Sequence, residues 1–206
     1  MQSIVQIVKK LNNTELGKGR THDTYVLIPN NLDITDVFEP ETEMEFTERC
    51  TGKKIKVRNT VGREKRIVGL GQYYREQELC AGDEIVFEKR ILNEAEGYYI
   101  YSRKYSDNLV IQKSKNGFEI LTIDRLDKFL NIARMKSADI RIEFLKSERK
   151  RNDSPDETDF YEVIIRGENL MNKLSGRNIL ELTFSEEKVV VSEFYGWKKY
   201  IFKEEG

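Results

Sequence analysis

Apolar and polar residues alternate in short runs along the whole chain. The run at 83–92, DEIVFEKRIL, is one example, and Gly, Asn or Asp bounds most of the runs. A period of two with many β-branched and aromatic residues is typical of β-strands, whose successive side chains point to opposite faces of a sheet. The pattern predicts strands over residues 3–11, 24–29, 44–50, 53–59, 83–92, 97–105, 108–114, 118–123, 139–147, 160–167, 178–184, 188–196 and 198–202.

Helical spacing of apolar residues is less common. It is clearest at 122–136, TIDRLDKFLNIARMK, where apolar residues recur every three or four positions from Leu126 to Ala133. Shorter helical segments are predicted at 32–40, 72–80 and 167–176. The predicted fold class is therefore mainly β with short helices.

The strands fall into two groups, which predicts two domains. The first group ends in the polar stretch at 105–108, so we place an N-terminal barrel at 1–106 and a small α+β domain of unknown role at 107–206. Residues 147–159, SERKRNDSPDETD, include no apolar residue and predict an exposed loop.

Composition limits the chemistry open to this chain. Its 206 residues carry a formal net charge of -1 and one histidine, His22. An HNH nuclease needs at least two histidines, and a structural zinc site needs four ligands. Cys50 and Cys80 are isolated, no apolar run approaches the roughly 18 residues of a membrane span, and the N-terminus does not resemble a secretory signal. We expect a cytoplasmic protein with no catalytic residues, no metal and no cofactor.

Charge is distributed unevenly along the sequence. Residues 30–48 include seven acidic side chains and no Lys or Arg, whereas residues 49–66 include eight basic side chains and one acidic one. Such segregation predicts a positive face, which would attract the phosphates of nucleic acid. The other interpretation is that alternating strand residues simply direct lysines to solvent.

Two polar segments have the residue types that read base edges. The first, 14–29, is a Gly-containing arm with Lys18, Arg20, Thr21 and His22 that leads into an apolar run ending at Pro29. The second, 59–67, follows Gly62 with a compact charged set, Arg63, Glu64, Lys65 and Arg66. Arg and Lys can bind guanine, and Glu can accept from the amino group of cytosine. A hairpin tip with mixed surface charge is the alternative for the second segment.

Three segments, in order, resemble a known family. The stretch KKLNNTELGKGRTHDTYVLIPNN at 9–31 and the stretch VGREKRIVGLG at 61–71 resemble the two recognition arms of the effector domain of EcoRII-type restriction endonucleases. The stretch QYYREQELCAGDEIVFEK at 72–89 resembles the closing part of the related plant B-three domain. The resemblance covers somewhat under half of the chain.

The resemblance implies a fold and a function. It implies a seven-stranded DNA-binding pseudobarrel that grips the major groove of double-stranded DNA with two arms. His22 would act in the first arm and Glu64, Lys65 and Arg66 in the second, with Lys18 and Arg63 as neighbours. Gly62 stands where some relatives have a basic residue, so the bases read should differ.

The function predicted is sequence-specific recognition of duplex DNA within, or related to, a restriction-modification system, with a nuclease subunit or a second copy as a possible partner. One alternative is a complete Mg²⁺-dependent restriction endonuclease that uses Asp156, Glu186 and Lys188. Glu186 and Lys188 fall where a hairpin turn is expected, rather than on the central strand that such a site needs. The other alternative is a protein-interaction barrel that does not bind DNA.

Overall fold

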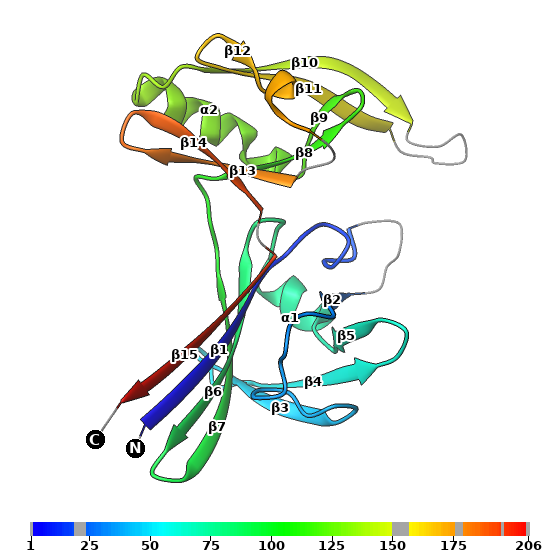
Figure 1. Cartoon of the computed structure of the whole chain (residues 1–206), viewed down its shortest axis with the longest axis vertical. Helices are drawn as coiled ribbons and strands as arrows, with labels where there is room; N and C mark the ends of the chain where they lie inside the picture. The colour runs from blue at the N-terminus through cyan, green and yellow to red at the C-terminus, as the bar shows by residue number, and fades with distance from the viewer. Residues whose placement is uncertain (1, 19–23, 150–156, 176–178, 195, 205–206) are drawn as a thin grey trace. The chain divides into compact units, whose positions relative to one another are not determined.

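The computed structural model describes residues 2–18, 24–149, 157–175, 179–194 and 196–204. The chain divides into two units, one made of 1–104 together with 195–206 and the other of 105–194 (Figure 1). The observed fold is mainly β with few short helices, which confirms the predicted fold class. None of the helices in the described ranges is long and apolar enough to cross a membrane.

The first unit is built on one curled sheet of eight strands. In chain order these are β1 (Gln2–Lys10), β2 (Tyr25–Ile28), β3 (Glu43–Glu48), β4 (Lys54–Val61), β5 (Lys65–Val68), β6 (Glu84–Leu92), β7 (Ala95–Arg103) and β15 (Trp197–Glu204). They lie side by side in the order β15-β1-β6-β7-β3-β4-β5-β2, and the β3–β7 pair is parallel. The helix α1 (Gly71–Glu76) follows β5.

The concave side of this sheet holds an aromatic core. Phe38 packs edge-on against Phe87 with ring centroids 4.9 Å apart, and Phe46 lies 5.3 Å from Phe38. All three rings are fully buried, and Tyr73 of α1 is buried with them. The interior therefore joins the sheet, α1 and the segment 32–39, which forms a single turn rather than the predicted helix.

The second unit combines a sheet with one longer helix. Its elements are β8 (Leu109–Ser114), β9 (Gly117–Ile120), η1 (Ile123–Arg125), α2 (Leu126–Met135), β10 (Ile140–Arg149), β11 (Glu157–Ile165), β12 (Glu168–Asn169), η2 (Leu170–Lys173), β13 (Ile179–Ser185) and β14 (Lys188–Glu193). The main strand order is β10-β11-β9-β8-β13-β14. Phe129 of α2 is fully buried 4.6 Å from Phe184. The helix predicted at 122–136 is thus present, and η2 replaces the one predicted at 167–176.

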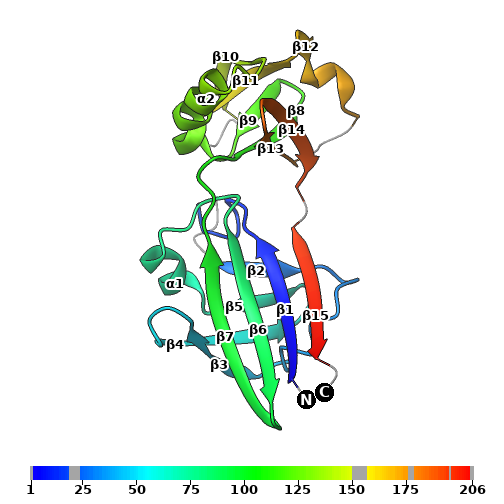
Figure 2. The same cartoon turned by 90° about the vertical axis from the view of Figure 1, so that its left-hand side faces the viewer.

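Two parts of the sequence-based division differ from the structure. Residues 197–204, which the division placed in the second domain, form β15 and pair antiparallel with β1 in the first unit, so the first sheet gains an eighth strand (Figure 2). Part of the predicted loop at 147–159 is strand, because Ser147, Glu148 and Arg149 pair with Asp159, Thr158 and Glu157. Polar pairs such as Ser147 Oγ to Asp159 Oδ1, 2.6 Å, hold this stretch without apolar residues.

Candidate nucleic-acid interface

The acidic and basic segments of the sequence are neighbours in space. Strand β3 carries three of the seven acidic residues and pairs antiparallel with β4, which carries three of the eight basic ones. Ion pairs connect Lys54 to Glu45 at 3.3 Å and Lys56 to Glu43 at 3.1 Å. Arg58 pairs with a third carboxylate, that of Glu41, at 2.8 Å. The segregation seen along the chain is therefore cancelled across these strands, and the positive face expected from it does not form on β3 and β4.

The second arm segment is a hairpin between β4 and β5. Its turn contains Gly62, Arg63 and Glu64, and β5 begins at Lys65. Arg66 Nη2 lies 2.5 Å and Arg66 Nε 3.1 Å from Glu64 Oε2, and the guanidinium also lies 4.2 Å from the ring centroid of Tyr25. Glu64 and Tyr25 therefore hold the orientation of a half-exposed arginine.

The other two cations of this hairpin differ from those of β3 and β4. Arg63 is exposed and Lys65 is half-buried. Within the described ranges, neither has a carboxylate within ion-pair distance. Their charges are thus less neutralised locally than those of Lys54, Lys56 and Arg58.

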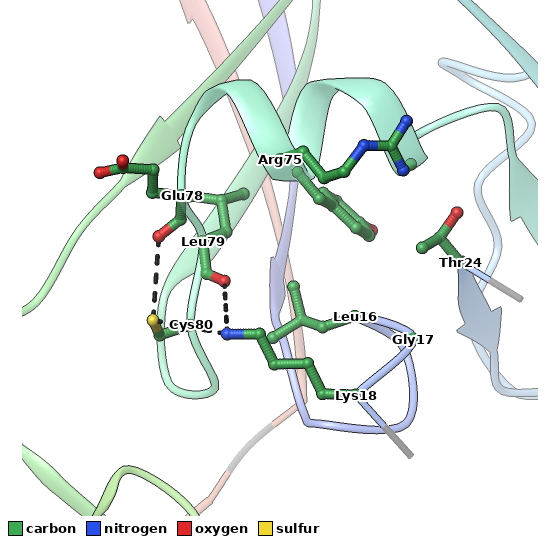
Figure 3. A pocket seen from close by; sticks show the side chains of 10 residues that line it. Leu16, Gly17, Lys18, Thr24, Arg75, Glu78, Leu79 and Cys80 are labelled. Atoms are coloured by element: carbon green, nitrogen blue, oxygen red, sulfur yellow. Dashed lines mark hydrogen bonds between the residues drawn. The ribbon is translucent and has the colours of Figure 1, made fainter. Parts of the chain in front are cut away.

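The first arm segment is described only at its two ends. Arg20, Thr21 and His22, which were predicted to contact DNA, lie outside the described residues. Lys18 is described, and its Nζ donates to the backbone oxygen of Leu79 at 3.4 Å and lies 3.8 Å from Cys80 Sγ (Figure 3). This lysine thus contacts the segment that follows α1.

A buried ion pair fixes the base of the first arm. Lys9 Nζ lies 3.1 Å from Glu15 Oε2, and both side chains are almost fully buried. Glu15 also accepts hydrogen bonds from the backbone amides of Asn12 and Leu27, each at 3.2 Å. Burial raises the pKa of Glu15 and lowers that of Lys9, while their mutual attraction opposes both shifts. Tyr25 N also donates to Glu15 O. Glu15 therefore contacts both β1, which precedes the arm, and β2, which follows it.

The C-terminal strand reinforces this base. Trp197 of β15 donates its indole N–H to the backbone oxygen of Leu27 at 3.0 Å. Lys9 Nζ lies 5.6 Å from the centroid of the same indole ring. A residue near the end of the sequence thus supports the strand into which the first arm leads.

A pocket of about 490 Å³ lies between the first arm segment and α1. Figure 3 shows Lys18 on the wall of the pocket that faces α1. Arg75 extends from α1 towards the side of Thr24. Gly71 begins α1, and a Cβ there would lie 2.6 Å from Thr24 Oγ1, so a larger residue would require the Thr24 hydroxyl to move. Arg75 forms no ion pair among the described residues, whereas Glu78 adds one carboxylate to the lining. Sequence reasoning missed Arg75, although it was the single arginine of the 72–80 segment.

Strand pairing joins β2, which follows the first arm, to β5, which follows the turn of the hairpin. β2 pairs antiparallel with β5, so Leu27 is opposite Arg66 and Ile28 is opposite Lys65. The two strands form the end of the sheet, with β2 outermost. Residues that are about 40 positions apart in sequence therefore share one margin of the molecule.

The residues of the endonuclease alternative lie in the second unit. Glu186 is exposed in the β13–β14 turn at a φ of 54°, and Lys188 is the exposed first residue of β14. The predicted hairpin is present, as Ser185 pairs with Lys188. Asp156 lies outside the described residues. In the described part of the chain no group of three or more His, Cys, Asp or Glu side chains could hold a metal ion.

Comparison with known proteins adds no family to this picture. No family model matches the chain, and no curated protein matches it. The resemblance to EcoRII-type effector domains therefore stays a prediction.

Proposed function

We propose that this chain is a sequence-specific, double-stranded DNA-binding protein of the cytoplasm, acting as the recognition component of a restriction-modification system or as a relative of one. The observation that supports this most is the β2–β5 pairing, which puts both arm segments at one margin of the sheet. Arg66 of β5 packs on the ring of Tyr25, the first residue of β2, so this cation lies close to the point at which β2 follows the first arm segment.

The β4–β5 hairpin has the chemistry for reading bases. Arg66 is a planar donor that can fork onto guanine, and its contacts with Glu64 and Tyr25 reduce the conformational entropy that it would lose on binding. Glu64 orients that arginine, and its carboxylate could also accept a hydrogen bond from the amino group of cytosine. Arg63 at the turn extends the cationic surface outward.

Lys18 and Arg75 are proposed as phosphate contacts. Both line the pocket beside the first arm, and phosphate contacts fix the orientation of a protein on the duplex without reading its sequence. Glu15 and Trp197 serve as positioning residues, because they hold the strand from which the arm extends.

The first test is selection of bound duplexes from a random library, followed by mobility shifts over a range of salt concentrations. We expect an enriched sequence and an affinity that falls with a log–log slope of about -0.9 per phosphate neutralised. Failure to retain any duplex at low salt would contradict the proposal. Cleavage of the selected duplex with Mg²⁺, lost in Lys188→Ala, would favour the endonuclease instead.

One observation favours a second candidate, a barrel that binds protein and not DNA. The ion pairs of β3 and β4 neutralise cations that a DNA-binding surface would otherwise use. In that case the salt titration would show no binding to any duplex.

A further inference from the structure

Within the described part of the chain, the strand β15 forms one margin of the eight-stranded sheet and pairs with β1 alone (Figure 2). Gly196 O accepts a hydrogen bond from Lys10 N, and the β1–β15 register continues from that pair. Opposite residues of an antiparallel pair alternate between bonded and non-bonded positions. Even-numbered residues of β15 therefore bond to β1, while the backbone groups of Lys199, Ile201 and Lys203 point outward.

The side chains at this edge are unusually apolar. Tyr200, Ile201 and Phe202 are consecutive and 40%, 54% and 51% exposed. Tyr200 and Phe202 stack with centroids 6.2 Å apart on one side of the strand. An exposed strand edge with apolar side chains is a template for pairing with another strand.

Lysines usually protect such an edge, but one of those in β15 is already engaged. Lys199 forms an ion pair with Asp36 and donates to the backbone oxygen of Asp33 at 3.0 Å. Its charge is thus neutralised at an exposed position of the segment that follows β2. The remaining lysines flank the three apolar residues and do not interrupt them.

We propose that a second copy of this chain docks on β15, with the two β15 strands antiparallel and the two-fold axis at Ile201. This register puts Ile201 opposite Ile201 of the second copy and Tyr200 opposite its Phe202. Both symmetric contacts join apolar side chains, and aromatic cross-strand pairs stabilise sheets. A shift of two residues in either direction would put a lysine opposite Phe202 or Ile201, so the apolar pattern itself selects the register.

The outward backbone groups fit this register as well. Ile201 would exchange both of its backbone hydrogen bonds with Ile201 of the second copy, because it is an outward-facing position in both chains. Lys199 and Lys203 would pair in the same way on either side. A two-fold contact of this kind is closed, and the result is a dimer rather than a fibre.

The test is sedimentation of the full chain between about 1 µM and about 1 mM. We expect a concentration-dependent dimer that Ile201→Pro abolishes, since proline lacks the outward N–H but leaves the bonds to β1 intact. The control is Val61→Lys, which changes an exposed apolar residue on β4, away from β15. This variant should leave the dimer unchanged.

A mixing experiment tests the register itself. Tyr200→Glu puts a carboxylate opposite Phe202 of the second copy. The dissociation constant of the dimer that this variant forms with itself should rise by at least about tenfold. Phe202→Lys should also weaken its own dimer, but a mixture of the two variants brings Glu opposite Lys and restores association, which native mass spectrometry resolves by mass. A chain that sediments as a monomer throughout, or a mixture that associates no better than its components, would overturn the proposal. Neither outcome depends on whether the protein binds DNA.

Discussion

At the scale of single residues, Lys9 and Glu15 form an ion pair in which both side chains are almost fully buried. Both lie under the first arm, and the carboxylate accepts two backbone amides besides the ammonium group. A buried pair of this kind is costly to break, since either partner left alone is an uncompensated charge. The pair therefore holds β1, the turn after it and β2 together at the base of the first arm segment.

Glu15→Leu should lower the free energy of unfolding by about 3–5 kcal/mol, because it leaves the Lys9 charge and two amides without an acceptor. Lys9→Met combined with Glu15→Gln keeps an acceptor for the amides and removes both charges, so it should recover much of that loss. Urea unfolding measures both variants. Equal unfolding midpoints for wild type and Glu15→Leu would show that the pair does not fix the fold.

Glu48 provides a test by pH. Burial raises the pKa of this carboxyl, whereas hydrogen bonds from the hydroxyl and amide of Thr51 and from the amide of Cys50 lower it. Together these hydrogen bonds outweigh burial, so the pKa lies below the ordinary 4.5. A pKa lower in the folded than in the unfolded state stabilises the fold above about pH 4.5, and that contribution is lost as the pH falls through the folded pKa.

Glu48→Gln should therefore be less stable than wild type at pH 7, and the difference should shrink as the pH falls below about 4.5. Urea unfolding at a series of pH values gives the comparison. A stability difference that stays constant over this range would mean that the carboxylate charge of Glu48 does not contribute.

At the scale of elements, the sequence predicted which segments form strands and helices better than it predicted which strands pair with one another. Most of the strands and the helix near 122–136 follow from local periodicity, which depends on residues a few positions apart. Periodicity carries no information on which strand pairs with which. The positive face predicted from residues 49–66 does not extend over β3 and β4 for that reason, since β3 brings Glu43 and Glu45 against Lys56 and Lys54.

The candidate site was predictable in part for the same reason. Glu64 and Arg66 are two positions apart on one hairpin, and their contact follows from local spacing. Arg75 comes from a different element, and its place in the lining of the same pocket as Lys18 depends on the packing of α1 near the first arm segment. The strand at 147–149 was missed because its polar pairs leave no apolar alternation to detect.

At the scale of the whole molecule, the first sheet is continuous in space but not in sequence. The chain leaves the first unit after β7, forms the second unit, and returns as β15. The alternation at 198–202 predicted a strand, but the partner of that strand, β1, lies about 200 residues away, and only the three-dimensional packing selects it. A boundary drawn at 106 therefore separates β15 from its sheet.

A rearranged chain tests this organisation. Gln2 is paired with Glu204, so a short turn could join residue 204 to residue 2 and give the order 196–204, turn, 2–104. We expect this chain to fold without the second unit, with a cooperative thermal transition. The plain fragment 1–105 lacks Trp197 and the β1 pairing and should be markedly less stable. Equal transition temperatures for the two would mean that β15 contributes little to the first unit.

The central claim, that the hairpin of β4 and β5 reads bases, is tested most directly by comparing Arg66→Ala with Lys56→Ala on selected and random duplexes. Both residues are cations of adjacent strands, but Lys56 is paired with Glu43 outside the proposed reading surface. We predict that Arg66→Ala costs about 1–3 kcal/mol of binding free energy on the selected site and much less on random DNA, while Lys56→Ala changes neither appreciably. Equal losses on both duplexes for Arg66→Ala, or equal losses for the two variants, would contradict base reading by this hairpin.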